Sequence, residues 1–265
     1  MKKFVLLVFV LMISICLYAQ NKPVIVDPVY KLPVKEKLNY RVYYKLSAFW
    51  ICGASVTFFT DTITYENKRA YKLQVDAFTR EKYRWIYSLE DHYTSITDCK
   101  TFLPLRFEEH NIEKKVNYDY TYVFDWENEI INMTLKQSEK PDRNIVEKLP
   151  DFITDTYSAV HYIRLWDYNE YTPGDTIEFQ TIVDGKIFKQ EVIYLGKESL
   201  KDNEGKMIKT FKLQAIIKNS TFFSKKKGIK VWVANNKERW ILQVDANIII
   251  GRIIAFIDTP GIPSH

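Results

Sequence analysis

Three side chains of one short segment, Asp155, Ser158 and His161, have the types found in a hydrolase triad. Their i, i+3, i+6 spacing puts successive members close together on one face of a helix. A working triad also needs an exposed nucleophile, an aligned base and a separate oxyanion hole, and these side chains would project side by side from one rod. The chain has no GxSxG motif. We therefore interpret the trio as a cap acid, a helix hydroxyl and an interfacial histidine, and predict a protein that is not an enzyme; a hydrolase is the less favoured alternative.

Acids also stand beside two histidines, in Glu90-Asp91-His92 and Glu108-Glu109-His110. Neighbours on a strand point to opposite faces, so only the acid two positions before each histidine shares its side. The chain has four histidines, no CxxC pair, and neither GxGxxG nor GxxxxGK[ST]. We interpret both runs as solvated strand ends and predict no metal site and no cofactor.

Arg164 lies nine residues after Asp155, a separation of about 13–14 Å along a helix, so the two cannot pair. A cation near the C-terminal end of a helix is well placed to bind a carboxylate from another element. We therefore expect Arg164 to anchor a loop or strand carboxylate rather than recognise a ligand.

Aromatic residues are unusually frequent, with 16 Phe, 18 Tyr and 6 Trp, 15% of the chain. Five of them alternate along one segment and would share one strand face: Tyr118, Tyr120, Tyr122, Phe124 and Trp126. Large rings fill the interior of a wide curved sheet, and tyrosines with polar tips also line ligand grooves. The stripe is thus either core or the lining of a ligand cleft, and its five residues are the candidate ligand-binding residues.

Alternation of apolar and polar residues dominates the chain and predicts about a dozen strands, each with one buried face. Turn signals such as Glu66-Asn67 and Asp184-Gly185 separate many of them, so the connections are short and the sheet is largely antiparallel. The predicted strands are 38–46, 52–60, 71–77, 84–97, 102–109, 117–126, 129–136, 175–183, 186–196, 208–218, 229–235 and 240–257.

One segment departs from this period and predicts a single helix over about 151–167. Asp151 or Thr154 can cap its start, and Asp155 suits its first turn. The polar stretch 137–150 before it is predicted to be an exposed loop. The expected fold is mainly β: a large bent antiparallel sheet or half-open β-barrel with one packed α-helix. It forms a single β-rich domain over 20–265, two β halves joined by the helix.

The first 19 residues read as a secretory signal peptide, because Lys2-Lys3 precede an apolar run over 4–17 and Ala19 offers a cleavage site. A membrane anchor and a lipoprotein modified at Cys16 are the weaker alternatives. Cleavage would leave 246 residues (265 − 19) and lower the net charge from +5 to about +3 (5 − 2). That charge is too small to indicate nucleic acid, and no later segment is long and apolar enough to span a membrane. We expect an exported protein of the periplasm or cell envelope.

Two cysteines, Cys52 and Cys99, remain after the predicted cleavage. An oxidising compartment would permit a disulfide between them. Two separately buried thiols, acting as small apolar residues, are the alternative. The sequence leaves both open because it does not give their separation in space.

The chain resembles a secreted bacterial family known as DUF 3108, a domain of unknown function. The resemblance lies in the order of short motifs over about 35–257: 36–42 with Gly53-Ala54, 104–107 with Phe124-Asp125, the helix 155–164, and 230–233 with 251–253. Asn235-Asn236 and His161 depart from the family pattern, where acidic residues and an apolar aromatic are expected. The resemblance implies a β-rich envelope protein of a Gram-negative bacterium; it implies no activity and transfers no catalytic residue.

Export, fold class and aromatic content together favour a non-catalytic module that binds or carries an apolar or amphipathic ligand, a lipid or a glycan. The alternative is a structural or assembly factor that binds another envelope protein, for example through an exposed edge strand. The sequence identifies neither the ligand nor the partner.

Overall fold

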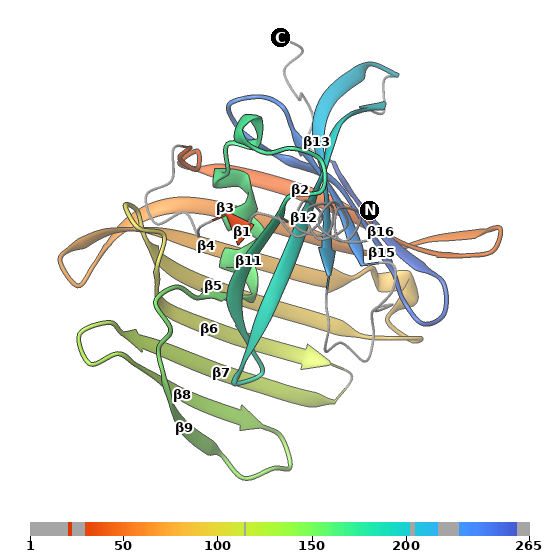
Figure 1. Cartoon of the computed structure of the whole chain (residues 1–265). Helices are drawn as coiled ribbons and strands as arrows, with labels where there is room; N and C mark the ends of the chain where they lie inside the picture. Colours follow the sequence, from red (N-terminus) through yellow and green to blue (C-terminus); the bar gives the residue numbers. More distant parts are fainter. Residues whose placement is uncertain (1–20, 23–29, 114, 202–204, 217–227, 259–265) are drawn as a thin grey trace, which may run out of the picture.

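One strongly bent sheet makes up most of the molecule, as expected for a half-open barrel (Figure 1). The computed structural model describes residues 21–22, 30–113, 115–201, 205–216 and 228–258, so the predicted signal segment lies outside the described residues. The strands are β1 (Asn21–Lys22), β2 (Glu36–Leu46), β3 (Phe49–Tyr65), β4 (Lys68–Thr79), β5 (Leu89–Asp98), β6 (Pro104–Glu113), β7 (Val116–Asp125), β8 (Ile130–Gln137), β9 (Arg143–Lys148), β10 (Thr154–Asp155), β11 (Thr176–Val183), β12 (Lys186–Lys201), β13 (Met207–Ile216), β14 (Ile229–Ala234), β15 (Ile241–Asn247) and β16 (Arg252–Ile257).

The strands follow the order β1-β11-β12-β13-β14-β15-β16-β2-β3-β4-β5-β6-β7-β8-β9, with β10 beside β11. Only the short β1 and β10 run parallel to their neighbour β11; every other pair is antiparallel. Strand β9 ends the path without pairing back to β11, so the barrel stays open. The predicted fold class is therefore confirmed, and α2 lies inside the bend (Figure 1).

The tight hairpins form where the turn signals predicted them. Glu66 and Asn67 have φ of 47° and 63°, and Asp184 and Gly185 have φ of 50° and 72°. Positive φ at both central residues is the geometry whose twist matches that of the flanking strands. Short-range chemistry thus fixes the register of β3 with β4 and of β11 with β12.

Apart from shifts of a few residues at strand ends, the predicted β pattern differs from the structure in three places. The stretch 137–150 contains the edge strand β9, because its backbone pairs with β8 although most of its side chains face solvent. The predicted strand 84–97 begins only at Leu89, after a 3-10 turn, η1 (Glu81–Tyr83). The long run 240–257 is split into β15 and β16 by a turn at 248–251.

The helical segment is shorter than the predicted 151–167. Helix α2 spans Thr156–Tyr162 and continues as the 3-10 turn η2 (Ile163–Leu165), with a further turn η3 (Tyr168–Glu170). It cannot begin earlier, because β10 pairs with β11 up to Asp155. Asp155, expected in the first turn, is the N-cap itself: its carboxylate accepts from the N–H groups of Tyr157 and Ser158. Within the described residues no helix is long and apolar enough to cross a membrane.

The hairpin between β11 and β12 reaches across the open side of the barrel. The Gly185 N–H donates to the Tyr122 hydroxyl at 3.0 Å. A Cβ at Gly185 would lie 2.7 Å from Leu135 Cδ1, so the tip of the hairpin packs directly on the Leu135 side chain. Packing against β7 and β8, rather than a hydrogen-bonded ladder, therefore narrows the opening.

Both remaining cysteines are free thiols, and the candidate disulfide is not formed. Cys52 precedes Gly53, which pairs with Arg80 beyond one end of β4, whereas the Cys99 N–H donates to Arg69 at the other end. Eleven residues of strand separate those two positions, roughly 30 Å or more. A disulfide needs Cα atoms about 4.4–6.8 Å apart, so this fold cannot join them.

Candidate functional site

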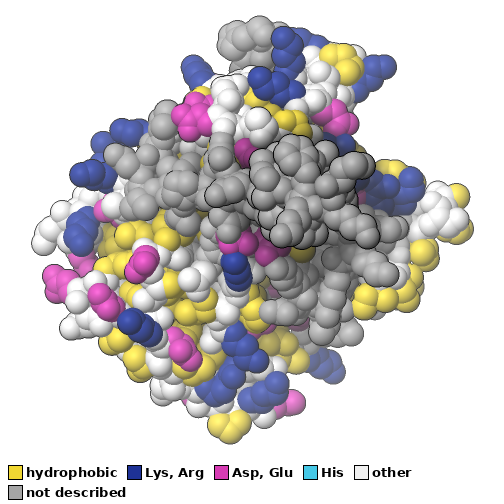
Figure 2. Space-filling view, in the orientation of Figure 1, with side chains coloured by type: hydrophobic (Ala, Val, Ile, Leu, Met, Phe, Trp, Pro, Cys, Tyr) yellow, Lys and Arg dark blue, Asp and Glu magenta, His cyan; other side chains and the backbone are white. Residues whose placement is uncertain are grey.

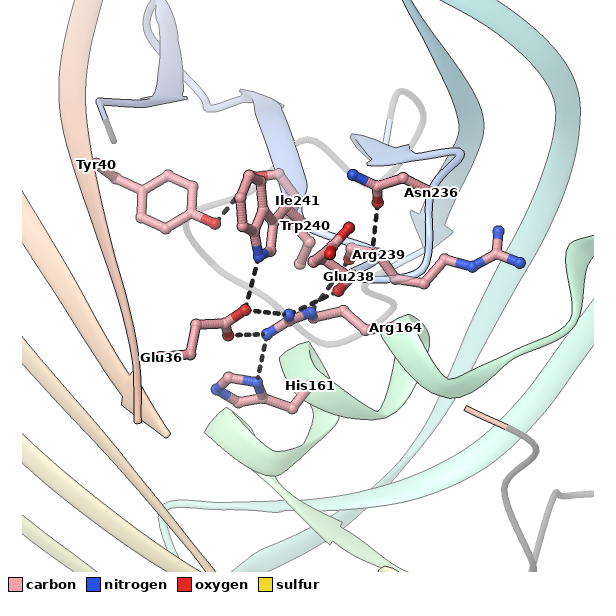
Figure 3. Close-up of polar contacts among 9 residues, drawn as sticks. All are labelled: Glu36, Tyr40, His161, Arg164, Asn236, Glu238, Arg239, Trp240 and Ile241. Atoms are coloured by element: carbon pink, nitrogen blue, oxygen red, sulfur yellow. Dashed lines mark hydrogen bonds and ion pairs between the residues drawn. The ribbon is translucent and has the colours of Figure 1, made fainter. Parts of the chain in front are cut away.

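A buried ion pair joins the helical segment to the first long strand (Figure 3). Arg164 lies in η2 and Glu36 begins β2. Arg164 Nη1 and Nη2 donate to Glu36 Oε2 and Oε1 at 2.7 and 2.8 Å. The side chains are 2% and 6% exposed, so both charges are removed from water. The bidentate hydrogen bonding offsets the cost of that desolvation. The prediction that Arg164 anchors a loop or strand carboxylate is confirmed, and the carboxylate belongs to a strand.

The same two side chains also bind the turn between β14 and β15. Trp240 Nε1 donates to Glu36 Oε1 at 2.7 Å, and Arg164 donates to the carbonyls of Glu238 and Arg239 at 2.8 and 3.1 Å. These five residues form the Arg164 network. It satisfies both charges and connects three distant segments, which is a structural role.

His161 completes this region without forming a triad. Its Nδ1 faces Arg164 Nη1 at 3.2 Å, and its buried Nε2 has no hydrogen-bond partner. Burial and the neighbouring Arg164 hold the pKa of His161 well below its usual value, so the ring is neutral. The Ser158 hydroxyl accepts from the Asp155 N–H, and the Asp155 carboxylate accepts from Ser95. Each group of the trio thus has a cap or packing role.

A second polar group lies on the inner face of β5 and β6 under α2. It comprises Asp91 and Tyr93 of β5, Glu109 and Asn111 of β6, and Tyr157 of α2, and we name it the Asp91 cluster. Asn111 Nδ2 donates to Glu109 Oε1 at 2.6 Å and to the Tyr93 hydroxyl at 2.7 Å. The Tyr93 hydroxyl donates to Asp91 Oδ2 at 3.3 Å, and its ring lies 4.0 Å from that of Tyr157.

This cluster gathers like charges in a poorly solvated place. Burial, and next the charge of Glu113, raises the pKa of Asp91 to about 6. Burial, and next the charges of Asp184 and Asp91, raises the pKa of Glu109 to about 8. Asp91 Oδ1 and Asn111 Oδ1 are buried without a hydrogen-bond partner. Glu109 is therefore largely protonated at neutral pH. The two buried oxygens, Asp91 Oδ1 and Asn111 Oδ1, can each accept a further hydrogen bond.

The two histidines with acidic neighbours lie on the outer face. His92 Nδ1 lies 2.8 Å from Asp76 Oδ1 on the adjacent strand, closer than the 3.6 Å between its Nε2 and Glu90 Oε1. His110 contacts Asp119 across β6 and β7. Over the part of the chain that the structure describes, no three His, Cys, Asp or Glu side chains are grouped as metal ligands. Strand pairing, which the sequence did not reveal, selects these partners.

The aromatic stripe of β7 faces inward along its length but has two different surroundings. Tyr120, Tyr122 and Phe124 are buried in the core cluster of β6 to β8. Trp126, half-buried, donates from Nε1 to the Pro104 carbonyl at 2.7 Å. Tyr118, also half-buried, meets Tyr120 edge to face at 6.1 Å between ring centroids. The middle of the stripe is therefore core, and Tyr120 at its edge also lines a pocket.

That pocket has a volume of about 370 Å³ and lies between β7, β8 and the connection to β9. Its lining is Tyr120, Leu135, Gln137, Lys140, Pro141 and Arg143. Of the five candidate ligand-binding residues, only Tyr120 contributes to this lining. The sequence gives no signal for Gln137, Lys140, Pro141 and Arg143, which all lie in the stretch 137–150 that is predicted to be an exposed loop. The alternation over 129–136 did place Leu135 on an inward face.

Comparison with known protein families matches residues 39–258 to a single model, described as a protein of unknown function, DUF3108. The chain belongs to the DUF3108 family. No curated protein matches it. A solved structure, the β-barrel-like protein of domain of unknown function DUF1849 from Brucella abortus, is similar with a TM-score of 0.53 and 6% identity. The alignment covers 86% of this chain and 97% of that one, so the likeness concerns the fold.

In this DUF3108 chain, two of the motifs that carried the family resemblance meet in space. The segment 36–42 supplies Glu36, and the helix 155–164 supplies Arg164. A third motif, 230–233, lies on β14, just before the turn that Arg164 binds. The Arg164 network is therefore where widely spaced motifs converge.

Proposed function

We propose that this protein is an exported, non-catalytic envelope protein that binds or carries an apolar or amphipathic ligand, and that the pocket beside Tyr120 is its binding site. The observation that carries the proposal is the composition of that pocket. Tyr120, Leu135 and Pro141 supply an apolar wall, while Lys140 and Arg143 supply positive charge. A few polar groups on an apolar concave surface are typical of small-molecule sites.

The charges of the pocket narrow the ligand class. An apolar chain would lie against Tyr120 and Leu135, and an anionic head group would meet Lys140 and Arg143. Gln137 adds an amide that can donate or accept. An anionic amphiphile, such as a lipid with a carboxylate or phosphate head, fits this lining better than a neutral glycan.

A hydrolase has less support. His161 is buried and neutral beside Arg164, and Ser158 is held by the cap of α2. The carboxyls of the Asp91 cluster have raised pKa values, yet none of its five residues is among those that line the pocket. Export is supported by the sequence pattern of residues 1–19.

Native mass spectrometry of protein purified from its own envelope tests the proposal. We expect an excess mass that is released on denaturation. In Gln137→Trp the indole fills the pocket and the excess mass is lost. Lys136→Trp is the matched control, because the adjacent side chain faces solvent on the other side of β8, and it keeps the excess mass.

A direct binding assay completes the test. Dodecanoate should bind the purified protein more tightly than dodecyltrimethylammonium, and Gln137→Trp should abolish the difference. Equal binding of both probes, or an excess mass unaffected in Gln137→Trp, would refute the pocket as the site. The denatured mass also tests cleavage after Ala19.

A further inference from the structure

Large apolar side chains are exposed mainly at one end of the sheet. Of the twelve that the described residues leave exposed, eight belong to three loops: Leu46, Phe49 and Trp50; Trp85, Ile86 and Tyr87; Ile249 and Ile250. Trp85 is 82% exposed, Ile249 75% and Phe49 72%. Monomeric proteins rarely expose so many large apolar groups together unless they contact something.

Strand pairing brings the three loops to the same end. Lys45 pairs with both Trp50 and Arg252, so the β2–β3 and β15–β16 turns are neighbours. Arg80 donates to the Gly53 carbonyl, which places the β4–β5 connection beside β3. Figure 1 shows the three loops projecting to the right, and Figure 2 shows hydrophobic surface at that end. We name residues 44–52, 80–88 and 247–252 the exposed loop end.

Positive charge surrounds these apolar tips. The exposed loop end contains five basic residues and one acidic residue: Lys45, Arg80, Lys82, Arg84 and Arg252 against Glu81. Arg252 is ion-paired with Asp245 of β15, which leaves a net charge of about +3 there (5 − 2). Lys45 Nζ lies over the Trp50 ring at 4.6 Å, and Lys82 Nζ over the Tyr83 ring at 4.7 Å. Trp85 keeps its indole N–H satisfied by the Lys82 carbonyl at 3.0 Å, so its ring can enter an apolar phase without an orphaned donor.

We propose that the exposed loop end docks on a bilayer surface that carries anionic lipid. Aromatic rings with polar tips favour the interface between head groups and acyl chains, and basic side chains beside them bind anionic head groups. The exposed apolar groups lie at the tips of three loops, and each loop supplies two or three of them. Such tips suit a deformable lipid surface better than the flat, shape-complementary face that a protein partner needs.

The pocket beside Tyr120 lies towards the same end of the strands. Strand β7 begins at Val116, which pairs with Glu113, and Glu113 pairs with Leu89 directly after the β4–β5 loop. Tyr118 pairs with Gln137, so the pocket lining is within a few residues of this end. Docking would thus hold the pocket close to a membrane. The docking proposal does not depend on what the pocket binds.

Vesicle flotation with the full chain tests the proposal. The probe is large unilamellar vesicles of dioleoylphosphatidylcholine with about 30 mol% dioleoylphosphatidylglycerol. We expect Trp50→Ser/Trp85→Ser to lower the partition coefficient at least about tenfold, because two large side chains no longer enter the interface. Val146→Ser/Met207→Ser removes exposed apolar groups outside the exposed loop end and should leave it unchanged. All variants share the same N-terminal segment, so a difference reports on the loops.

Charge and depth give independent readouts. Lys82→Gln/Arg84→Gln should lower binding to the anionic vesicles by about fivefold for each basic side chain, and about 0.5 M NaCl should have a similar effect on the wild type. Brominated phosphatidylcholine should quench the fluorescence of Trp50 and Trp85. Equal flotation of all variants, or no flotation at all, overturns the proposal. So does a concentration-dependent dimer lost only in Trp50→Ser/Trp85→Ser, because the occupant would then be a second copy.

Discussion

The Arg164 network and the Asp91 cluster are both polar groups inside the same barrel, at opposite ends of the helical segment, yet their electrostatics are opposite. Glu36 and Arg164 carry opposite charges, and each has further hydrogen bonds to fixed partners. Asp91 and Glu109 carry the same kind of group, and burial raises the pKa of both. Rings connect the two: Phe58 contacts both Tyr157 and His161.

This difference indicates that the Arg164 network stabilises the fold, whereas the protonation of the Asp91 cluster changes with pH. A buried pair with all its partners resists change, because removing one member leaves an uncompensated charge. Buried carboxyls that lie close together titrate near neutral pH, and the fold becomes more stable when one of their charges is removed. The four substitutions below test that contrast.

Glu36→Gln should have the largest effect. It leaves the buried guanidinium of Arg164 without its counter-charge, so the free energy of unfolding should fall by about 3–5 kcal/mol. Urea unfolding followed by circular dichroism measures it. Glu147→Gln, at an exposed position on β9, is the control and should change stability by less than about 0.5 kcal/mol. A loss of the same small size for both would mean that the pair contributes little.

Glu109→Gln should stabilise the protein at alkaline pH by about 1–2 kcal/mol, since the half-buried group is partly solvated. The pKa of Glu109 rises from 4.5 to about 8 on folding, so the folded state holds the extra proton and stability falls as pH rises through this window. The gain should be absent below pH 4.5 and complete above pH 8. Thermal unfolding across that range measures it. Glu108→Gln, on the outer face, should show no such pH-dependent gain.

Asp91→Asn should give a smaller gain, about 1 kcal/mol, complete above pH 6 and absent below pH 3.8, because the pKa of Asp91 is raised to about 6. It should also lower the titration midpoint of Glu109, whose pKa Asp91 helps to raise. Carboxyl resonances in carbon-13 NMR report both changes. Asp61→Asn, on an exposed part of β3, is the control. If Asp91→Asn instead destabilised the protein above pH 6, the ionised carboxylate of Asp91 would make a favourable contact in the fold, contrary to its raised pKa.

His161→Phe should have the smallest effect, within about 1 kcal/mol of zero. The change removes a weak acceptor for Arg164 and also removes a buried Nε2 that has no partner, and the two terms oppose each other. Because His161 is neutral in the fold, its replacement should remove a stability loss seen below about pH 6.5 in the wild type. A large loss at neutral pH would assign His161 a role that its contacts do not explain.

Local patterns predicted much of the fold correctly. Alternation placed Tyr120, Tyr122 and Phe124 on one buried face, and the Asp184-Gly185 turn formed as expected. The sequence also predicted that Arg164 would find a strand carboxylate. It failed at 137–150, where β9 is recognised only through its pairing with β8, and it left the disulfide open because separation in space has no local signal.

The candidate sites depended on contacts between distant segments. Nothing in the local sequence around Asp91 or Glu109 indicated that their side chains would be buried near Asp184, 75 residues beyond Glu109. The same holds for the pocket beside Tyr120 and for the convergence of three apolar loops at one end. The sequence by itself determined most strands and turns and the approximate position of the helix, since these follow from neighbours within a few residues. The tertiary structure decided which charges met, which rings became core and which surface stayed exposed, because these depend on the register and curvature of the whole sheet.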